Sequence, residues 1–349
     1  MLVLDGSYGE GGGQLLRSAL SLSLILKLPF KMIKIRAGRP KPGLQPQHYC
    51  CVEACKKLSQ ARVEGDYLYS QELFFSPEHS PENKVYTFDI GTAGSTTLLF
   101  QTLFYPLALS QGGTLVLKGG THVPYSPPYH YIERVYLPVV ENFGFQGTIT
   151  LERAGFYPKG GGEIIAHIKA TRKLKIPQFP EKFFPQRIHI LSLISEDLPS
   201  HILERQAKAA QAILKAEGYE GEIFLEKVKA SSPGTMLLVY GEGGPLRAGF
   251  SILGRKGVPA EEVGKRAAQE FLHFLKTQAQ VEEHLGDQLL LPASLSLLSS
   301  EEKTFSYTVS KLTRHLLTQA WLIPQFLKEI SIKVEGKEGE KGGVILERR

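Results

Sequence analysis

Near its start the chain carries the stretch Asp5-Gly6-Ser7-Tyr8-Gly9-Glu10-Gly11-Gly12-Gly13-Gln14-Leu15-Leu16-Arg17, which runs directly into an apolar segment at residues 15–26. Glycine permits positive φ angles and lets a ligand approach the backbone closely. If residues 15–26 form a helix, its free N–H groups and its positive dipole end face this loop and favour an anion such as phosphate. A tight glycine turn before a buried helix explains the same pattern. The stretch alone leaves both interpretations open.

Glu10 is an unusual residue for a loop that binds only phosphate. Its carboxylate fits there if a divalent cation lies between it and the phosphates, because such cations prefer oxygen ligands. We therefore expect Glu10 to bind a metal ion. No Gly-Lys-Ser or Gly-Lys-Thr follows the loop, so it is not a P-loop.

The bulk composition is that of an ordinary globular protein. A length of 349 residues predicts about two domains. A net charge of +6 fits a polyanionic partner without requiring one. The three cysteines, Cys50, Cys51 and Cys55, have neither metal-ligand spacing nor a distant partner, which indicates a reducing compartment. We see no signal peptide and no apolar run long enough to cross a bilayer, and therefore expect a cytoplasmic protein.

The order glycine loop, helix, strand, helix, strand occurs three times. Its first copy covers residues 5–65, with helices at 15–26 and 45–58 and strands at 30–35 and 61–65. The second has a loop at 89–95, helices at 96–109 and 129–142, and strands at 114–118 and 148–153. The third has Gly286-Asp287-Gln288, helices at 289–298 and 312–327, and strands at 304–309 and 329–334. This repeat predicts a pseudo-threefold α/β body whose loop-to-helix ends can converge.

An insertion separates the second and third copies. Residues 175–185 are proline-bearing and resemble a linker, and residues 186–278 show the order strand, helix, strand, strand, helix. We expect helices at 200–216 and 259–276. The predicted division is therefore a catalytic domain at 1–182 and 279–349, and a smaller inserted α/β domain at 183–278. A charged, glycine-rich tail at 336–343 is either a hairpin turn or a disordered loop.

Other candidate ligand residues are cations near loops. Arginine forks match phosphate oxygens in pairs, and the candidates near predicted strand ends are Arg17, Arg36, Arg39 and Lys41. A second glycine cluster at 155–162 is either a wide hairpin loop or, with Arg153 and Lys159 beside it, a site for an anionic backbone. The turn at 231–234 is likewise either structural or ligand-facing.

His315 and Asp287-Gln288 carry no function by pattern alone. The chain has ten histidines, and nothing in the spacing gives His315 a partner. An acid followed by an amide often caps a helix. Taken with the loops above, however, the motifs resemble the RNA 3'-terminal phosphate cyclase family along nearly the full length. These motifs are Gly9-Glu10-Gly11-Gly12-Gly13-Gln14, Arg36-Ala37-Gly38-Arg39, Ile90-Gly91-Thr92-Ala93-Gly94-Ser95, the cluster at 155–162, His284-Leu285-Gly286-Asp287-Gln288 and His315-Leu316-Leu317-Thr318.

The resemblance implies a fold and a reaction. The fold is a repeated α/β body akin to that of EPSP synthase, with a smaller inserted α/β domain. In the family's reaction a histidine, here His315, attacks the α-phosphorus of ATP and forms a histidine–AMP intermediate. AMP then passes to an RNA 3'-phosphate, and the vicinal 2'-hydroxyl attacks to leave a 2',3'-cyclic end. The partner is therefore an RNA with a 3'-phosphate, and a homodimer is compatible with the resemblance.

The same resemblance implies roles for single residues. Glu10 matches the ligand of a divalent metal, Mg²⁺ or Mn²⁺. Phosphate contacts are expected from Gln14, Arg17 and Arg39. Nucleotide contacts are expected from Gln101, His284, Leu285, Gly286, Asp287 and Gln288.

Three local departures and two alternatives accompany the resemblance. Gln319 stands where the family carries asparagine, Gly286 where alanine is common, and residues 125–128 form a variant loop. One alternative is the non-catalytic, ribosome-biogenesis branch of the same fold, which lacks the histidine that His315 matches. The other is an enolpyruvyl transferase of the EPSP synthase type, which uses no adenylylated histidine.

Overall fold

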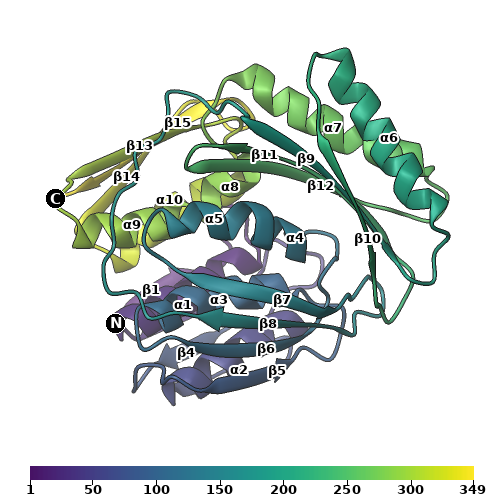
Figure 1. Ribbon diagram of the computed structural model, residues 1–349. Coiled ribbons are helices and arrows are strands. Elements are labelled where there is room, and N and C mark those ends of the chain that lie inside the picture. Colours follow the sequence, from purple (N-terminus) through teal and green to yellow (C-terminus); the bar gives the residue numbers. More distant parts are fainter.

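The computed structural model describes all 349 residues, and its strands form four separate sheets (Figure 1). Their strand orders are β1-β2-β4-β3, β5-β6-β8-β7, β13-β15-β14 and β10-β9-β11-β12. Helices accompany every sheet, so the predicted α/β class is confirmed, and the mixed sheets make it of the α+β type. None of the helices combines the length and the apolar character that crossing a bilayer requires.

The first three sheets belong to three repeats of similar order. The first repeat contains β1 (Leu2–Asp5), α1 (Gly13–Leu26), β2 (Phe30–Ile33), α2 (Pro46–Ser59), β3 (Arg62–Glu64) and β4 (Leu73–Ser76). The second contains β5 (Val85–Asp89), α3 (Thr96–Ala108), β6 (Gly113–Gly119), α4 (Tyr129–Tyr131), η1 (Ile132–Tyr136), α5 (Leu137–Glu141), β7 (Gly147–Arg153) and β8 (Gly162–Ile168). The third contains α8 (Glu283–Gln288), α9 (Leu290–Ser299), β13 (Thr304–Val309), α10 (Arg314–Phe326), β14 (Ile330–Glu335) and β15 (Gly342–Arg348).

Strand pairing follows one scheme in all three repeats. The first strand pairs parallel with the second, and the last strand lies antiparallel between the second and the third. In the third repeat a single parallel bridge from Val281 to Val309 replaces the first strand. The predicted order of the inner helices and strands is therefore confirmed, but the predicted repeat omitted the first strands β1 and β5 and the last strands β4, β8 and β15. β4 has only four residues. The charged tail at 336–343 joins β14 to β15, so the hairpin alternative is correct there.

The predicted helix at 129–142 is divided into α4, η1 and α5. The N–H group of Leu137 reaches back to the carbonyl of Ile132, which is the wide turn of a π-helix. Pro138 follows directly and has no N–H group to continue regular α-helical bonding. A π-turn of this kind often occurs at a functional site, and η1 carries Tyr136 toward the cavity described below.

The inserted segment has one strand more than predicted. It contains β9 (Arg187–Ser195), α6 (His201–Ala216), β10 (Glu222–Val228), β11 (Thr235–Gly243), β12 (Leu246–Leu253) and α7 (Ala260–Thr277). Figure 1 shows α6 and α7 on the outer face of this sheet, whose other face looks toward the body. Because β12 also packs against η1 and α5, the domain limits at 183 and 278 stay a prediction.

The three repeats meet at three equivalent junctions. In each junction, a residue near the start of the second helix of one repeat contacts a residue at the start of the first helix of another repeat. The contacting pairs are Gln47 with Ser95, Tyr131 with Glu282, and His315 with Gln14. The loop-to-helix ends therefore pair off at separate junctions.

The glycine cluster at 155–162 is a hairpin loop between β7 and β8. A Cβ on Gly160 would lie 2.7 Å from the Cα of Ala93, so the cluster packs directly against the second glycine loop. Its carbonyl at Gly161 accepts hydrogen bonds from Arg153 Nε at 2.8 Å and from Ser231 Oγ at 2.9 Å. The hairpin interpretation is thus supported, and the turn at 231–234 serves to join the inserted sheet to this hairpin.

A buried chain of hydrogen bonds links that hairpin to β10. The N–H of Gly155 donates to Thr121 Oγ1 at 2.9 Å, so the Thr121 hydroxyl proton can point to His122 Nδ1, 2.7 Å away. His122 Nε2 then donates to His130 Nδ1 at 2.9 Å, and His130 Nε2 faces the Glu226 carboxylate at 3.4 Å. With both rings neutral, only donation that runs from Thr121 toward Glu226 places a ring proton next to the Glu226 carboxylate.

Acid is expected to weaken the fold through His122. Burial lowers the pKa of His122 well below 6.5, and His130 lowers it further. As the pH falls, His122 therefore binds a proton in the unfolded chain before it does so in the folded protein. Its contribution to the free energy of unfolding is fully present above about pH 6.5 and is lost below that pH. Between about pH 6.5 and 5.5 this group should remove about 1 kcal/mol from the free energy of unfolding. Urea denaturation of His122→Gln, whose amide retains both hydrogen-bonding roles, should show a smaller acid loss. An equal loss would rule out His122 as the cause.

Candidate active site

A cavity of about 540 Å³ lies between the inner helices of the body and the inserted sheet. Its wall contains seven of the residues expected from the sequence: Gln14, Arg17, Gln101, His284, Asp287, Gln288 and His315. They come from α1, α3, α8 and α10, and are brought together by the packing of α1 against α3 and α10. The site is therefore formed by segments almost as far apart in sequence as the chain permits.

Two of the expected nucleotide contacts do not line this cavity. Leu285 and Gly286 are buried within the packing of α8. A Cβ on Gly286 would lie 2.7 Å from Val309 Cγ1, and its carbonyl accepts a hydrogen bond from Tyr307 at 2.7 Å. Their position indicates that they shape the helix from which the neighbouring Asp287 and Gln288 project.

His315 stands at the junction between the first and third repeats. Its Nδ1 atom is 2.8 Å from Gln14 Oε1, and Gln14 Nε2 donates a hydrogen bond to the Asp287 carboxylate. Because the amide nitrogen of Gln14 is used by Asp287, its oxygen must accept from His315. The proton of a neutral His315 therefore lies on Nδ1, and Nε2 carries the free electron pair.

The surroundings also keep His315 neutral. Its pKa is lowered from 6.5 to about 4, mainly by burial and further by the positive charges of Arg17 and Arg39. Half of the side chain stays accessible, at 49% exposure, so the ring can meet a substrate. Burial raises the pKa of Asp287 to about 7. An accessible, neutral imidazole of fixed tautomer has the properties of a nucleophile or a general base.

Glu10 lies beside the same ring, outside the cavity wall. Its carboxylate is 3.8 Å from His315 Nδ1 and forms an ion pair with Arg39. The N–H of Glu10 donates to Thr318 Oγ1 at 3.0 Å, which attaches the glycine loop to α10. A Cβ on Gly9 would lie 2.2 Å from this hydroxyl oxygen, so only glycine permits the approach. The loop is thus held in register with the helix that carries His315.

No cluster of three or more histidine, cysteine or acidic side chains could hold a metal by itself. A divalent cation at Glu10 would therefore need most of its oxygen ligands from phosphates and water. Mg²⁺ is commonly bound in this way, by one or two carboxylates together with substrate phosphates. The Glu10 carboxylate is only 10% exposed and is paired with Arg39, but it lies beside His315 and fits a cation that arrives with a nucleotide.

The arginines expected to hold phosphates differ in their surroundings. Arg17 lines the cavity, has no ion-pair partner, and has its pKa lowered by burial. A partly buried, uncompensated guanidinium is a strong site for an anion. Arg36, by contrast, donates to the carbonyls of Lys41 at 2.6 Å and Gly43 at 3.0 Å. Arg36 therefore stabilises its own loop.

Several residues of the wall were not expected from the sequence. β12 contributes Gly249 and Ser251, and a Cβ on Gly249 would lie 2.6 Å from Val135 Cγ2, so glycine lets β12 approach η1. Tyr131 and Tyr136 also reach the cavity, and the variant loop at 125–128 forms part of its wall. No local signal marks these residues, because their role depends on how the inserted sheet packs.

Comparisons with known proteins agree with the motifs. The family model described as RNA 3'-terminal phosphate cyclase matches residues 8–334. The chain is 42% identical to the RNA 3'-terminal phosphate cyclase of Gloeothece citriformis over 345 residues, which cover 97% of each chain. It is 42% identical to that of Pyrococcus furiosus, covering 100% of this chain and 99% of the relative. Identity to the Sulfolobus acidocaldarius protein of that description is 41%, with 96% and 97% covered.

Proposed function

The chain belongs to the RNA 3'-terminal phosphate cyclase family, and we propose that it uses ATP to convert an RNA 3'-phosphate to a 2',3'-cyclic phosphodiester. The observation that carries this proposal is the arrangement of His315. Its ring is accessible and neutral, and its contact with Gln14 leaves Nε2 free to attack. The same arrangement argues against the non-catalytic branch of the family, which lacks this histidine.

In the first step His315 Nε2 attacks the α-phosphorus of ATP. A nitrogen–phosphorus bond forms, the bond to pyrophosphate breaks, and the ring proton stays on Nδ1, where Gln14 accepts its hydrogen bond. Developing positive charge on the ring is stabilised through Gln14 by the carboxylate of Asp287. Because the ring of this adduct carries a positive charge, breaking the nitrogen–phosphorus bond releases neutral imidazole, a good leaving group, which keeps the adenylate reactive.

Phosphate groups are held by the cations around the ring. Arg17 has unused donors facing the cavity and is suited to the phosphates of ATP. Arg39 becomes free to bind phosphate once its partner Glu10 pairs with a cation instead. Glu10 would hold a divalent cation, which offsets the charge that develops on departing pyrophosphate.

In the second step an oxygen of the RNA 3'-phosphate attacks the phosphorus of the bound AMP and the bond to His315 breaks. In the third, the vicinal 2'-hydroxyl attacks the activated 3'-phosphorus, loses its proton and expels AMP. Activation is required because a bare phosphate monoester offers no good leaving group. Recognition of a 2'-hydroxyl also restricts the substrate to RNA.

Incubation with ATP, Mg²⁺ or Mn²⁺ and an RNA with a labelled 3'-phosphate tests the overall reaction. We expect the label to become resistant to phosphatase, with one AMP and one pyrophosphate formed per cyclised end. Label that stays sensitive to phosphatase under all these conditions would contradict the proposal. An enolpyruvyl transferase would likewise leave the RNA unchanged.

Glu10→Gln is expected to slow adenylylation by roughly 10²-fold at limiting metal, because the amide binds a cation far more weakly than a carboxylate. The rate should be measured across a Mn²⁺ titration. Direct binding of Mn²⁺ in the presence of a non-hydrolysable ATP analogue, followed by electron paramagnetic resonance, gives a readout independent of activity. Glu301→Gln, on an exposed residue away from the cavity, is the matched control. Unchanged Mn²⁺ binding in Glu10→Gln would remove Glu10 from this role.

A further inference from the structure

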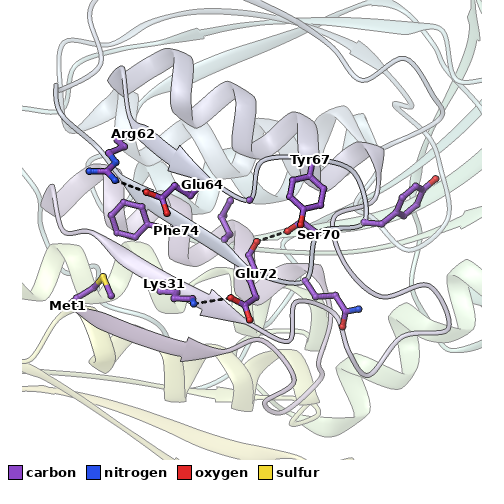
Figure 2. Close-up of a pocket in the computed structure, with 12 residues that line it drawn as sticks. Met1, Lys31, Arg62, Glu64, Tyr67, Ser70, Glu72 and Phe74 are labelled. Carbon is purple, nitrogen blue, oxygen red and sulfur yellow. Dashed lines mark hydrogen bonds and ion pairs between the residues drawn. The ribbon is translucent and has the colours of Figure 1, made fainter.

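A second hollow, of about 810 Å³, lies over β2, β3 and β4 at the first sheet (Figure 2). Its charged side chains are already paired. Lys31 Nζ is 2.8 Å from a Glu72 carboxylate oxygen, and Arg62 is 2.6 Å from Glu64. The floor is thus electrically balanced, so the groove itself has no strong attraction for a polyanion.

One side of this groove carries an exposed aromatic loop at residues 66–71. Tyr67 and Tyr69 are 65% and 63% exposed, an unusual state for two large rings so close together. Tyr69 also has φ of +68°, a conformation that non-glycine residues seldom adopt and that costs free energy. The backbone is held there by hydrogen bonds, since Tyr69 N donates to Leu44 O at 2.8 Å and Leu44 N donates to Ser70 O at 3.0 Å.

The partner in these hydrogen bonds is the basic loop at residues 34–44. It contains four cations and no acidic residue. Lys34 and Arg39 are paired with Asp5 and Glu10, whereas Lys41 is exposed and has no carboxylate partner. Because Arg39 reaches Glu10 beside His315, the basic loop is continuous with the active site at one end and with the tyrosines at the other.

We propose that the RNA strand leaves the active site along the basic loop and that its upstream bases stack on Tyr67 and Tyr69. This inference rests on the proposed cyclase function. Exposed aromatic rings beside a line of cations are the arrangement by which proteins bind single-stranded RNA. The phosphates follow Lys41 and its neighbours, and the bases turn toward the electrically balanced groove. A phosphate backbone in the groove itself would meet Glu64 and Glu72 and is disfavoured.

The main competing route is the hairpin at 155–162, which carries the exposed Tyr157 and Lys159. Arg153 at its base already donates to Gly161 O, and the loop is packed against Ala93 and Ser231. The hairpin has one exposed ring, Tyr157. The other aromatic residue on the loop, Phe156, is buried. Tyr157 provides a control of matched type and exposure.

The test compares the double variant Tyr67→Ala/Tyr69→Asn with the wild type; asparagine tolerates the positive φ at residue 69. We expect KM for cyclisation of a 3'-phosphorylated RNA of about ten nucleotides to rise roughly tenfold or more, since each stacked base contributes substantially. Self-adenylylation by ATP and KM for a 3'-phosphorylated dinucleotide should stay unchanged. The double variant to phenylalanine should retain the low KM, because it keeps both stacking rings.

Each other outcome has a separate meaning. If Tyr157→Ala raises KM for the longer RNA and the double variant does not, the strand follows the hairpin and the proposal is wrong. Equal KM values in all variants would also overturn it. If the wild type forms the adenylate but cyclises neither RNA, the proposed function fails instead of the strand path.

Discussion

His315→Ala is expected to form no protein-bound adenylate, with label incorporation lowered by roughly 10⁴-fold or more. Loss of a covalent nucleophile has effects of this size because the remaining groups can bind the substrate but cannot make the bond. The variant should fold normally, since half of the side chain is exposed and the ring fills no core position. We expect ATP binding to survive, because Arg17, Gln101 and Gln288 remain in the cavity wall.

The measurement uses ATP labelled at the α-phosphorus with Mg²⁺ or Mn²⁺. A histidine–AMP bond is labile to acid and stable to base, which distinguishes it from an acyl or ester adduct. His273→Ala is the matched control, because His273 is exposed on α7 and does not line the cavity. Its label should persist. Undiminished label in His315→Ala would instead assign the nucleophile to another residue, and the absence of label in the wild type would favour a non-catalytic or enolpyruvyl-transferring protein.

The sequence predicted the repeated elements more successfully than the contacts between them. Element order follows from local signals, such as glycine before an apolar helix and alternation in strands, and these act over a few residues. Short β4 lacked such a signal, as did the division of the helix at 129–142 by the π-turn before Pro138. Both depend on the packing around them.

For the site, the contacts of single residues could not be predicted, because their partners lie far away along the chain. Gln14 and His315 are separated by 301 positions, and nothing local to either indicates the other. The family resemblance singled out His315 and predicts a phosphate contact for Gln14, and neither prediction anticipates that the Gln14 amide contacts both His315 and Asp287. Neither the sequence pattern nor the family resemblance predicted Ser251, because only the packing of β12 against the body carries it to the cavity wall.

The equivalent junctions explain why only the contact between His315 and Gln14 suits the proposed reaction. Gln47 meets only a backbone N–H of Ser95, and Tyr131 meets the fully buried Glu282. Only the junction between the third and first repeats combines an accessible titratable ring with an amide that is itself oriented by a carboxylate. The proposed chemistry therefore depends on one side-chain pair within an otherwise repeated arrangement.

Gln14→Met is consequently expected to lower the rate of adenylylation by about 10²-fold while the nucleophile itself remains. Methionine keeps the length of the side chain but cannot accept the Nδ1 proton, so His315 loses its preference for the tautomer with a free Nε2. Groups that orient a reactive histidine usually contribute effects of this size, and a wrong tautomer can cost more. Nitrogen NMR of the labelled imidazole should show the Nδ1–H tautomer in the wild type and a mixture in the variant.

Gln319→Met distinguishes orientation of His315 from a general disturbance of the cavity. Gln319 lines the same wall but donates to Ser18 and makes no hydrogen bond to His315, so its variant should retain the tautomer and lose at most a few-fold in rate. Asp287→Asn gives an independent test of the same chain of contacts. Its neutral amide can present either an oxygen or a nitrogen to Gln14, and the Gln14 amide is then free to flip and offer its nitrogen to the ring. A rate loss in Asp287→Asn together with a mixed tautomer would assign the effect to orientation, whereas a rate loss with an unchanged tautomer would place Asp287 in nucleotide binding alone.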